Sequence, residues 1–164
     1  MIDVVKLNSF RETLEQLYWM ETQLEFLKEK TASFYIHNPQ YQKIITKISN
    51  DSRKYREILE NIIKNLKGID LFWLREKTGH METAINFNGL SSEEEIMRDI
   101  LDEERKALHY YKQVYDETDK QFIRDIWTGD DKTRFFERIS FLISEEHKHI
   151  GWLESIQSEV QQFS

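Results

Sequence analysis

The stretch ISFLISEEHKHIGWL, residues 139–153, carries a helical apolar repeat with polar residues inserted in its middle. Leu142 and Leu153 belong to a repeat of apolar side chains at three- and four-residue spacing, the period of an amphipathic α-helix. Glu146 and His149 stand at positions of the same repeat where apolar residues are expected. Because residues three apart share one face of a helix, the stretch predicts a helix that turns a carboxylate and an imidazole toward the core.

The same repeat appears in four segments of the chain. They run near residues 5–35, 39–66, 92–118 and 131–161. A chain of 164 residues with one Pro and five Gly has few turns and room for one core. Four matched amphipathic helices predict an all-α four-helix bundle, in a single domain that spans residues 1–164.

The connections between these segments predict the order of the helices. Asn38 and Pro39 suit the N-cap and the first position of a helix, so the first two helices should form an antiparallel hairpin. The crossover 67–91 is long enough to run the length of the bundle, which allows the second and third helices to be parallel. The connection 119–131 then returns the fourth helix antiparallel to the third. We therefore expect two antiparallel hairpins joined by a long crossover.

Composition and charge exclude several classes of protein. Without Cys, the chain has no disulfide framework, thiolate-bound metal or Cys nucleophile, and it suits a reducing compartment. A formal net charge of −7 disfavours binding to nucleic acid or to anionic membranes. The sequence opens with no basic region followed by an apolar run and has no bilayer-length apolar stretch, so we expect a cytoplasmic location. Phosphate-binding glycine loops and nucleophile-elbow motifs are absent, which removes support for nucleotide-dependent and hydrolase activities.

Polar residues interrupt the apolar repeat near the middle of every predicted helix. We call this set the mid-bundle layer, and it consists of Glu21, Ser52, Glu104, Glu146 and His149. Counted from the predicted turns, the members in each hairpin are level with one another, so all should meet at one height. Within the charged run 102–106, only Glu104 is expected to face inward.

The mid-bundle layer would hold more negative charge than its surroundings balance. A buried carboxylate is costly unless it is paired, and neighbouring carboxylates raise one another's pKa. No Lys or Arg occupies the apolar repeat at this height. A divalent ion would supply the missing charge, and carboxylate oxygens together with an imidazole nitrogen suit iron, manganese or zinc.

These residues resemble the ferritin-like di-iron carboxylate superfamily, and within it the rubrerythrin-like bundles. The resemblance rests on Glu146-x-x-His149 in the last helix, Glu104 in the third and Glu21 in the first, and with the helix order it covers essentially the whole chain. It implies a ferritin-like fold, non-haem iron or manganese as cofactor, and an oxidoreductase that acts on oxygen or peroxide. The metal ligands that it implies are Glu21, Glu104, Glu146 and His149.

The second predicted helix departs from the family pattern. Where the family carries another Glu-x-x-His, this chain has Ser52 and Tyr55. The resemblance then implies a half-site for one ion, with Glu104 and His149 as terminal ligands and Tyr55 as a hydrogen-bonding neighbour. Asp51, one position off the repeat, would replace a lost ligand only if its short side chain reached inward. The Cys module of rubrerythrins is also missing, so the resemblance names no electron donor.

Two alternatives remain open on the sequence alone. The polar residues could form a metal-free hydrogen-bonded network in a non-catalytic bundle that serves oligomerisation or partner binding, so the sequence does not decide whether the protein is an enzyme. Off the repeat, Phe141 and Trp152 would form an apolar patch beside Gly151, which favours a homodimer. The other histidines are expected in loops or on exposed faces, and they are His37, His80, His109 and His147.

Overall fold

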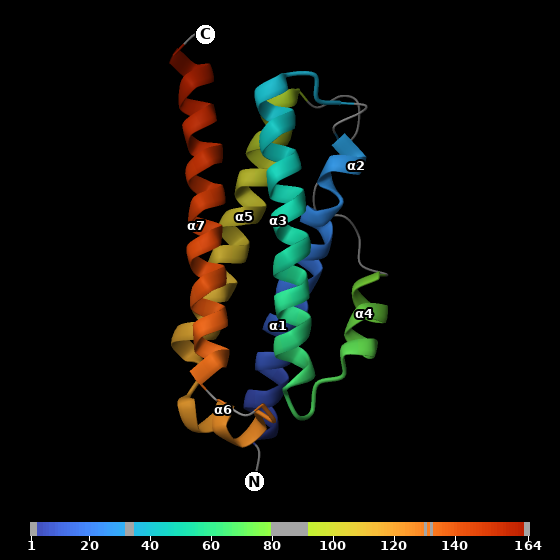
Figure 1. Ribbon diagram of the computed structural model, residues 1–164, viewed down its shortest axis with the longest axis vertical. Helices are drawn as coiled ribbons and strands as arrows, with labels where there is room; N and C mark the ends of the chain where they lie inside the picture. Colours follow the sequence, from blue (N-terminus) through green and yellow to red (C-terminus); the bar gives the residue numbers. More distant parts are fainter. Residues whose placement is uncertain (1–2, 32–34, 80–91, 130, 132, 163–164) are drawn as a thin grey trace.

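The computed structural model describes residues 3–31, 35–79, 92–129, 131 and 133–162, and Figure 1 shows four long helices with three short ones at their ends and side. In chain order the helices are α1 (Val4–Glu25), α2 (Leu27–Thr31), α3 (Pro39–Lys64), α4 (Leu71–Gly79), α5 (Glu93–Glu117), α6 (Lys120–Ile126) and α7 (Thr133–Gln162). The predicted all-α four-helix bundle is confirmed. Among the described helices, none is long and apolar enough to cross a membrane.

The four long helices follow the predicted order. α1 rises from the N-terminus, α3 and α5 both descend, and α7 rises again to the C-terminus (Figure 1). A carboxylate contact fixes the parallel pair, because Oε1 of Glu93 at the start of α5 accepts from the backbone N–H of Asn38 at the start of α3, at 2.9 Å. The same oxygen also accepts from the N–H of His37. The two hairpins and their long crossover are therefore as expected, and residues 80–91 of that crossover, with His80, lie outside the described part.

The first helix is shorter than the predicted 5–35 segment. α1 ends at Glu25, and the N–H of Phe26 turns back to the carbonyls of Gln23 and Leu24. The carbonyl of Glu25, the last residue of α1, accepts a hydrogen bond from the hydroxyl of Ser49 on α3. The chain resumes as the short helix α2. The apolar repeat continues through this break, which is why the sequence pattern did not reveal it.

The connection expected at 119–131 contains the short helix α6, which closes the lower end of the bundle (Figure 1). Two backbone hydrogen bonds join the ends of α3 and α6. The N–H of Lys67 donates to the carbonyl of Ile126, and the N–H of Thr128 donates to the carbonyl of Asn65, both at 2.7 Å. The start of the crossover is thus attached directly to the second hairpin.

The core is interrupted at the mid-bundle layer. Positions of the predicted repeat whose side chains are described are buried, apart from the half-buried Leu7, whereas Val160 lies outside the described side chains. The buried apolar residues form two clusters, one toward the α6 end and one toward the α2 end. On α7 the first cluster reaches Leu142 and the second begins at Ile150, so the polar residues of the layer lie between them.

Candidate metal centre

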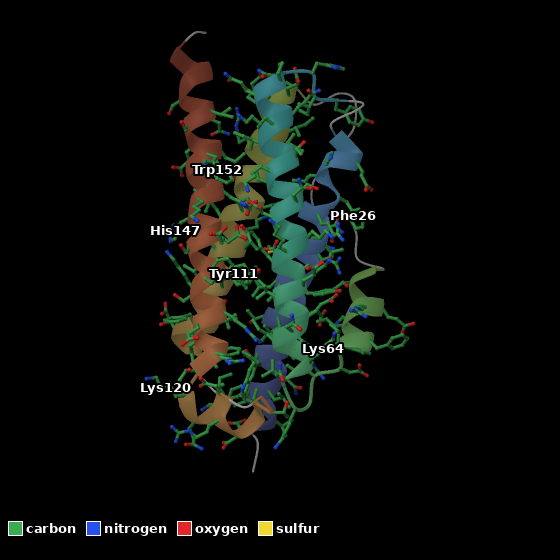
Figure 2. All side chains as sticks on the ribbon, viewed as in Figure 1. Phe26, Lys64, Tyr111, Lys120, His147 and Trp152 are labelled. Atoms are coloured by element: carbon green, nitrogen blue, oxygen red, sulfur yellow. The ribbon has the colours of Figure 1, made fainter. Side chains whose placement is uncertain are left out.

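All five members of the mid-bundle layer are inside the protein. The side chains of Glu21, Ser52, Glu104, Glu146 and His149 belong to residues that are each 0% exposed. They come from all four long helices, and two residues labelled in Figure 2 contact the layer, Tyr111 through Glu21 and Trp152 through His149. The register of the sequence repeat therefore places five polar residues in one buried layer.

Three members of the layer form a compact group of ligand atoms. One atom each from Glu104, Glu146 and His149 lies within 4.8 Å of the others. Nδ1 of His149 is 3.0 Å from Oε1 of Glu104. Glu21 is outside this compact group, and its Oε1 accepts a hydrogen bond from the hydroxyl of Tyr111 at 2.9 Å.

Asp51 reaches the centre from the position next to Ser52. Its Oδ2 is 3.1 Å from Nε2 of His149, so the two ring nitrogens of this histidine face two different carboxylates. The other oxygen, Oδ1, accepts from Nζ of Lys47 at 3.2 Å. The sequence had offered Asp51 only as a lesser possibility, because a side chain one position off the repeat is displaced around the helix.

Tyr55 stands where the family pattern would have its second histidine, and it lies against the centre. Its hydroxyl donates to Oε2 of Glu145 at 2.8 Å and is 3.4 Å from Nε2 of His149. Lys148 holds the other oxygen of Glu145 at 2.7 Å. Glu145 is a contact that sequence reasoning missed, since it precedes Glu146 and falls off the apolar repeat.

Several carboxylate oxygens in the layer have no hydrogen-bond donor. They are both oxygens of Glu146, Oε2 of Glu104 and Oε2 of Glu21, and the hydroxyl oxygen of Ser52 is also without a partner. Buried polar atoms in folded proteins nearly always have a partner, and an unsatisfied one costs free energy. Oxygens that are grouped, buried and lacking donors fit a cation, so the residues present suit the ion that the sequence led us to expect.

The pKa values of the residues in the layer reflect the same excess of buried carboxylates over positively charged groups. Burial raises the pKa of Glu21 to about 7, and the charge of Glu104 acts in the same direction. Burial and then the charges of Glu104 and Glu21 raise the pKa of Glu146 well above its usual range. Burial by itself would lower the pKa of His149, but the hydrogen bond and charge of Glu104, with help from Asp51, raise it to about 9.

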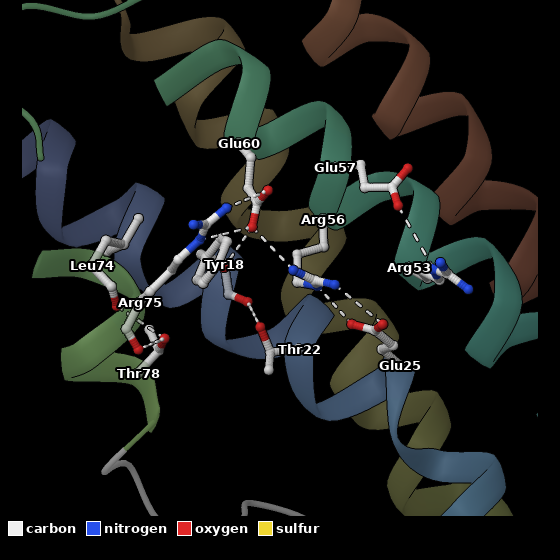
Figure 3. Close-up of polar contacts among 10 residues, drawn as sticks. All are labelled: Tyr18, Thr22, Glu25, Arg53, Arg56, Glu57, Glu60, Leu74, Arg75 and Thr78. Carbon is white, nitrogen blue, oxygen red and sulfur yellow. Dashed lines mark hydrogen bonds and ion pairs between the residues drawn. The ribbon is translucent and has the colours of Figure 1, made fainter. Parts of the chain in front are cut away.

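A second group of carboxylates, the buried Glu60 and the half-buried Glu25, lies nearby and is fully paired (Figure 3). We call it the arginine network, and it consists of Tyr18, Glu25, Arg56, Glu60 and Arg75. Arg56 binds Oε2 of Glu25 at 2.6 Å and Oε1 of Glu60 at 3.0 Å, and Arg75 binds Oε2 of Glu60 at 2.9 Å. The hydroxyl of Tyr18 donates to Glu60 at 2.8 Å. This network joins α1, α3 and α4.

One smaller expectation needs revision. Glu103 is buried as well as Glu104, at 8% exposure, because Nζ of Lys106 binds it at 3.1 Å along the edge of α5. Of the tryptophans off the repeat, Trp19 and Trp127 are buried, whereas Trp73 is 39% exposed. His37, His109 and His147 are exposed, as predicted.

Four helices in this order, with a long crossover between two hairpins, define a ferritin-like fold, and the comparison with solved structures confirms it. The chain is similar to the bacterioferritin-related protein from Bacteroides fragilis, which is described as a dodecameric thioferritin. The two structures align with a TM-score of 0.69 over 99% of this chain and 90% of that chain, at 13% sequence identity. No family model matches this sequence, and no curated protein matches it significantly.

Proposed function

We propose that this protein is a ferritin-like metal-binding protein that holds one iron or manganese ion in the mid-bundle layer. The observation that carries the proposal is the group of buried carboxylate oxygens without donors on Glu21, Glu104 and Glu146. Among the described residues, no Lys or Arg side chain is hydrogen-bonded to any of these three carboxylates. A divalent ion with oxygen and imidazole ligands would neutralise them.

Each residue has a definite part in such a site. Glu104, Glu146 and His149 supply the grouped ligand atoms, and Glu21 faces the same layer with one oxygen bound to Tyr111. Asp51 holds Nε2 of His149, which fixes the orientation of the ring when Nδ1 serves as the ligand atom. When bound, iron or manganese would supply one-electron chemistry with oxygen or peroxide, and the protein would then act as an oxidoreductase.

A metal-free role is the second candidate, and one observation favours it. Both ring nitrogens of His149 already have carboxylate partners, Glu104 and Asp51. A protonated His149 would offset part of the charge of the layer without any ion. In that case the bundle would be a scaffold, and its outer surfaces would carry the function.

We further propose that the chain assembles with copies of itself, a homodimer being the smallest assembly. The structural neighbour is described as dodecameric. On α7, Phe141 is 49% exposed, and a side chain built on Gly151 would meet no atom within 4 Å. An exposed aromatic ring and, ten residues along the same helix, an open glycine leave room for a second helix to pack on α7.

Metal analysis of the purified, untagged protein tests the proposal. After anaerobic loading with Fe(II) or Mn(II) and desalting, mass spectrometry should find about one equivalent per chain. The double variant Glu146→Ala/His149→Ala should lose it. Glu103→Gln is the matched control, because Glu103 is buried on the same helix as Glu104 but is paired with Lys106, and it should retain the ion.

Thermal unfolding provides a second readout. An ion at one hundred times its Kd stabilises the folded state by about 2.7 kcal/mol, so a chelator should lower the Tm of the wild type and leave that of the double variant unchanged. Two equivalents of metal per chain would indicate a second metal site, with Asp51 as the first candidate for its additional ligand. The absence of metal after both loadings would contradict the metal-binding proposal and leave the scaffold role.

A further inference from the structure

A groove on the outside of the bundle runs between α3 and α7. Its volume is about 630 Å³, and its lining includes Ile44, Trp152 and Ile156 among predominantly apolar surface. Pockets for small organic ligands are commonly about 300–1,000 Å³ and mostly apolar with a few polar groups. Gln40 and Asn50 supply such polar groups here.

The charged residues of the groove are all basic. Lys43 and Lys47, one turn apart on α3, line it, and no carboxylate does. Three other hollows of the described residues each combine acidic with basic residues in their lining. In a chain with a net charge of −7, a hollow with two lysines and no acid is suited to a negatively charged ligand.

The two lysines differ in how far other side chains already neutralise their charge. Lys47 gives one hydrogen bond to Asp51, but its side chain remains 55% exposed and its Nζ lies 5.9 Å from the centre of the Trp152 ring. Lys43 is exposed and forms no ion pair among the described residues. Because Asp51 already offsets part of the charge of Lys47, an anion in the groove would bind chiefly at Lys43, with Lys47 one turn away on the same face.

Trp152 connects the groove to the mid-bundle layer. On its inner side its ring lies 5.4 Å from the ring of His149, at 34° between the planes. The same side chain lines the groove, and Nζ of Lys47 lies over its ring, so a flat ligand ring reaches the indole where the flexible lysine head moves aside toward the anionic group. A ligand held here would be separated from His149 by a single indole.

We propose that the groove binds a planar aromatic ligand that carries an anionic group, with its ring against Trp152 and its charge at Lys43 and Lys47. This site goes beyond the proposed metal function and does not depend on it. Flavin mononucleotide is a suitable probe, because it combines a planar ring with a phosphate and its fluorescence is quenched when it stacks on tryptophan. Riboflavin, which has the same ring without the phosphate, isolates the contribution of the charge.

The test is a fluorescence titration of the purified full chain, with and without chelator. Flavin mononucleotide should bind about tenfold more tightly than riboflavin, since a charge-assisted contact contributes about that factor. Lys43→Glu should weaken its binding about tenfold or more. Lys54→Glu is the matched control, an exposed lysine on the same helix outside the groove, and it should leave the Kd unchanged.

A second variant examines the ring contact. Trp152→Leu should weaken both flavins by about tenfold, and circular dichroism should confirm that this variant folds. The proposal is overturned if the wild type does not bind the mononucleotide at about 1 mM, or if Lys43→Glu binds it as tightly as the wild type. It is equally overturned if the groove variants alter only the oligomeric state in sedimentation, because the groove would then be an interface between chains.

Discussion

The bundle holds two groups of largely buried carboxylates, and the two groups differ in the positively charged side chains that face them. The arginine network sets two carboxylates, Glu25 and Glu60, against two guanidinium groups, Arg56 and Arg75. The mid-bundle layer sets the carboxylates of Glu21, Glu104 and Glu146 against the single imidazole of His149.

The pKa values separate the two groups in the same way. Burial would raise the pKa of Glu60, but the hydrogen bonds from Arg75 and Tyr18 and the nearby guanidinium charges lower it below its usual value. Burial raises the pKa of Glu21 to about 7, and no guanidinium opposes it. Buried acids can thus be structural where the chain supplies the counter-charge, whereas in the layer the described side chains supply one imidazole for three carboxylates.

The largest expected effect comes from removing the counter-charge of the arginine network. Arg56→Leu leaves Glu25 and Glu60 without their shared partner. Because these side chains are 12–24% exposed and Glu60 keeps Arg75, the free energy of unfolding should fall by about 3 kcal/mol, the lower end for a buried pair. Urea unfolding measures the change. Arg53→Leu is the matched control, because its pair with Glu57 is exposed and 3.7 Å long, and it should change stability by less than about 0.5 kcal/mol. Equal effects would mean that the network is not structural.

The pH dependence of stability should have opposite signs in the two groups. In the metal-free protein the pKa of His149 is raised to about 9 from 6.5, so its stabilising contribution is complete below pH 6.5 and is lost as the pH rises to 9. The raised pKa of Glu21 likewise favours the folded state at low pH, and this contribution is lost between pH 4.5 and 7. Glu60, with its lowered pKa, contributes stability above pH 4.5 that is lost as the pH falls further.

Chemical unfolding with a chelator present, at pH 6 and at pH 9, measures this difference. The free energy of unfolding should fall by about 3 kcal/mol between the two values, as the shift of His149 implies. Bound metal requires the deprotonated ligands, so the loaded protein should lose less stability over the same range. A metal-free protein equally stable at both values would contradict the charge state that we assign to His149.

The smallest expected effect is on stability, and replacing one Glu by Gln should raise it in the mid-bundle layer and lower it in the arginine network. In the metal-free protein, Glu146→Gln removes a buried acid and supplies an amide that can donate to the free oxygens of Glu21 and Glu104, so stability should rise by about 1 kcal/mol. Glu60→Gln should instead lower stability, because Arg56 and Arg75 lose their partner. Urea unfolding at pH 7 with a chelator measures both. If both variants lost stability by a similar amount, Glu146 would be as well paired as Glu60, and the proposed difference between the layer and the network would be wrong.

The sequence predicts the layer because its residues obey the helical repeat. Glu21, Glu104, Glu146 and His149 stand at core positions, and core position along a helix is a local property that periodicity reveals. The break at Phe26 was not predictable in this way, because the apolar repeat continues through it and the contact at its edge comes from Ser49 on another helix.

Contacts made from the edges of the helices were equally difficult to predict. Asp51 reaches His149, and Glu145 reaches Tyr55, from positions one residue away from the repeat. Whether such side chains turn inward depends on the spacing of the neighbouring helix. The arginine network was missed for the same reason, since Arg56 and Glu60 gain their partners from α1 and α4.

The division of the apolar core at the layer makes the two ends of the bundle unequal in their resistance to local opening. Toward the α6 end, α6 and the paired backbone of Leu66 and Trp127 connect the hairpins. Toward the α2 end, Glu93 at the start of α5 makes a polar contact across the hairpins with Asn38 at the start of α3. Segments with fewer cross-connections open at lower free energy, so the α2 end should undergo sub-global unfolding first. Water and ions would then reach the carboxylates from that end while the other half of the bundle stays folded.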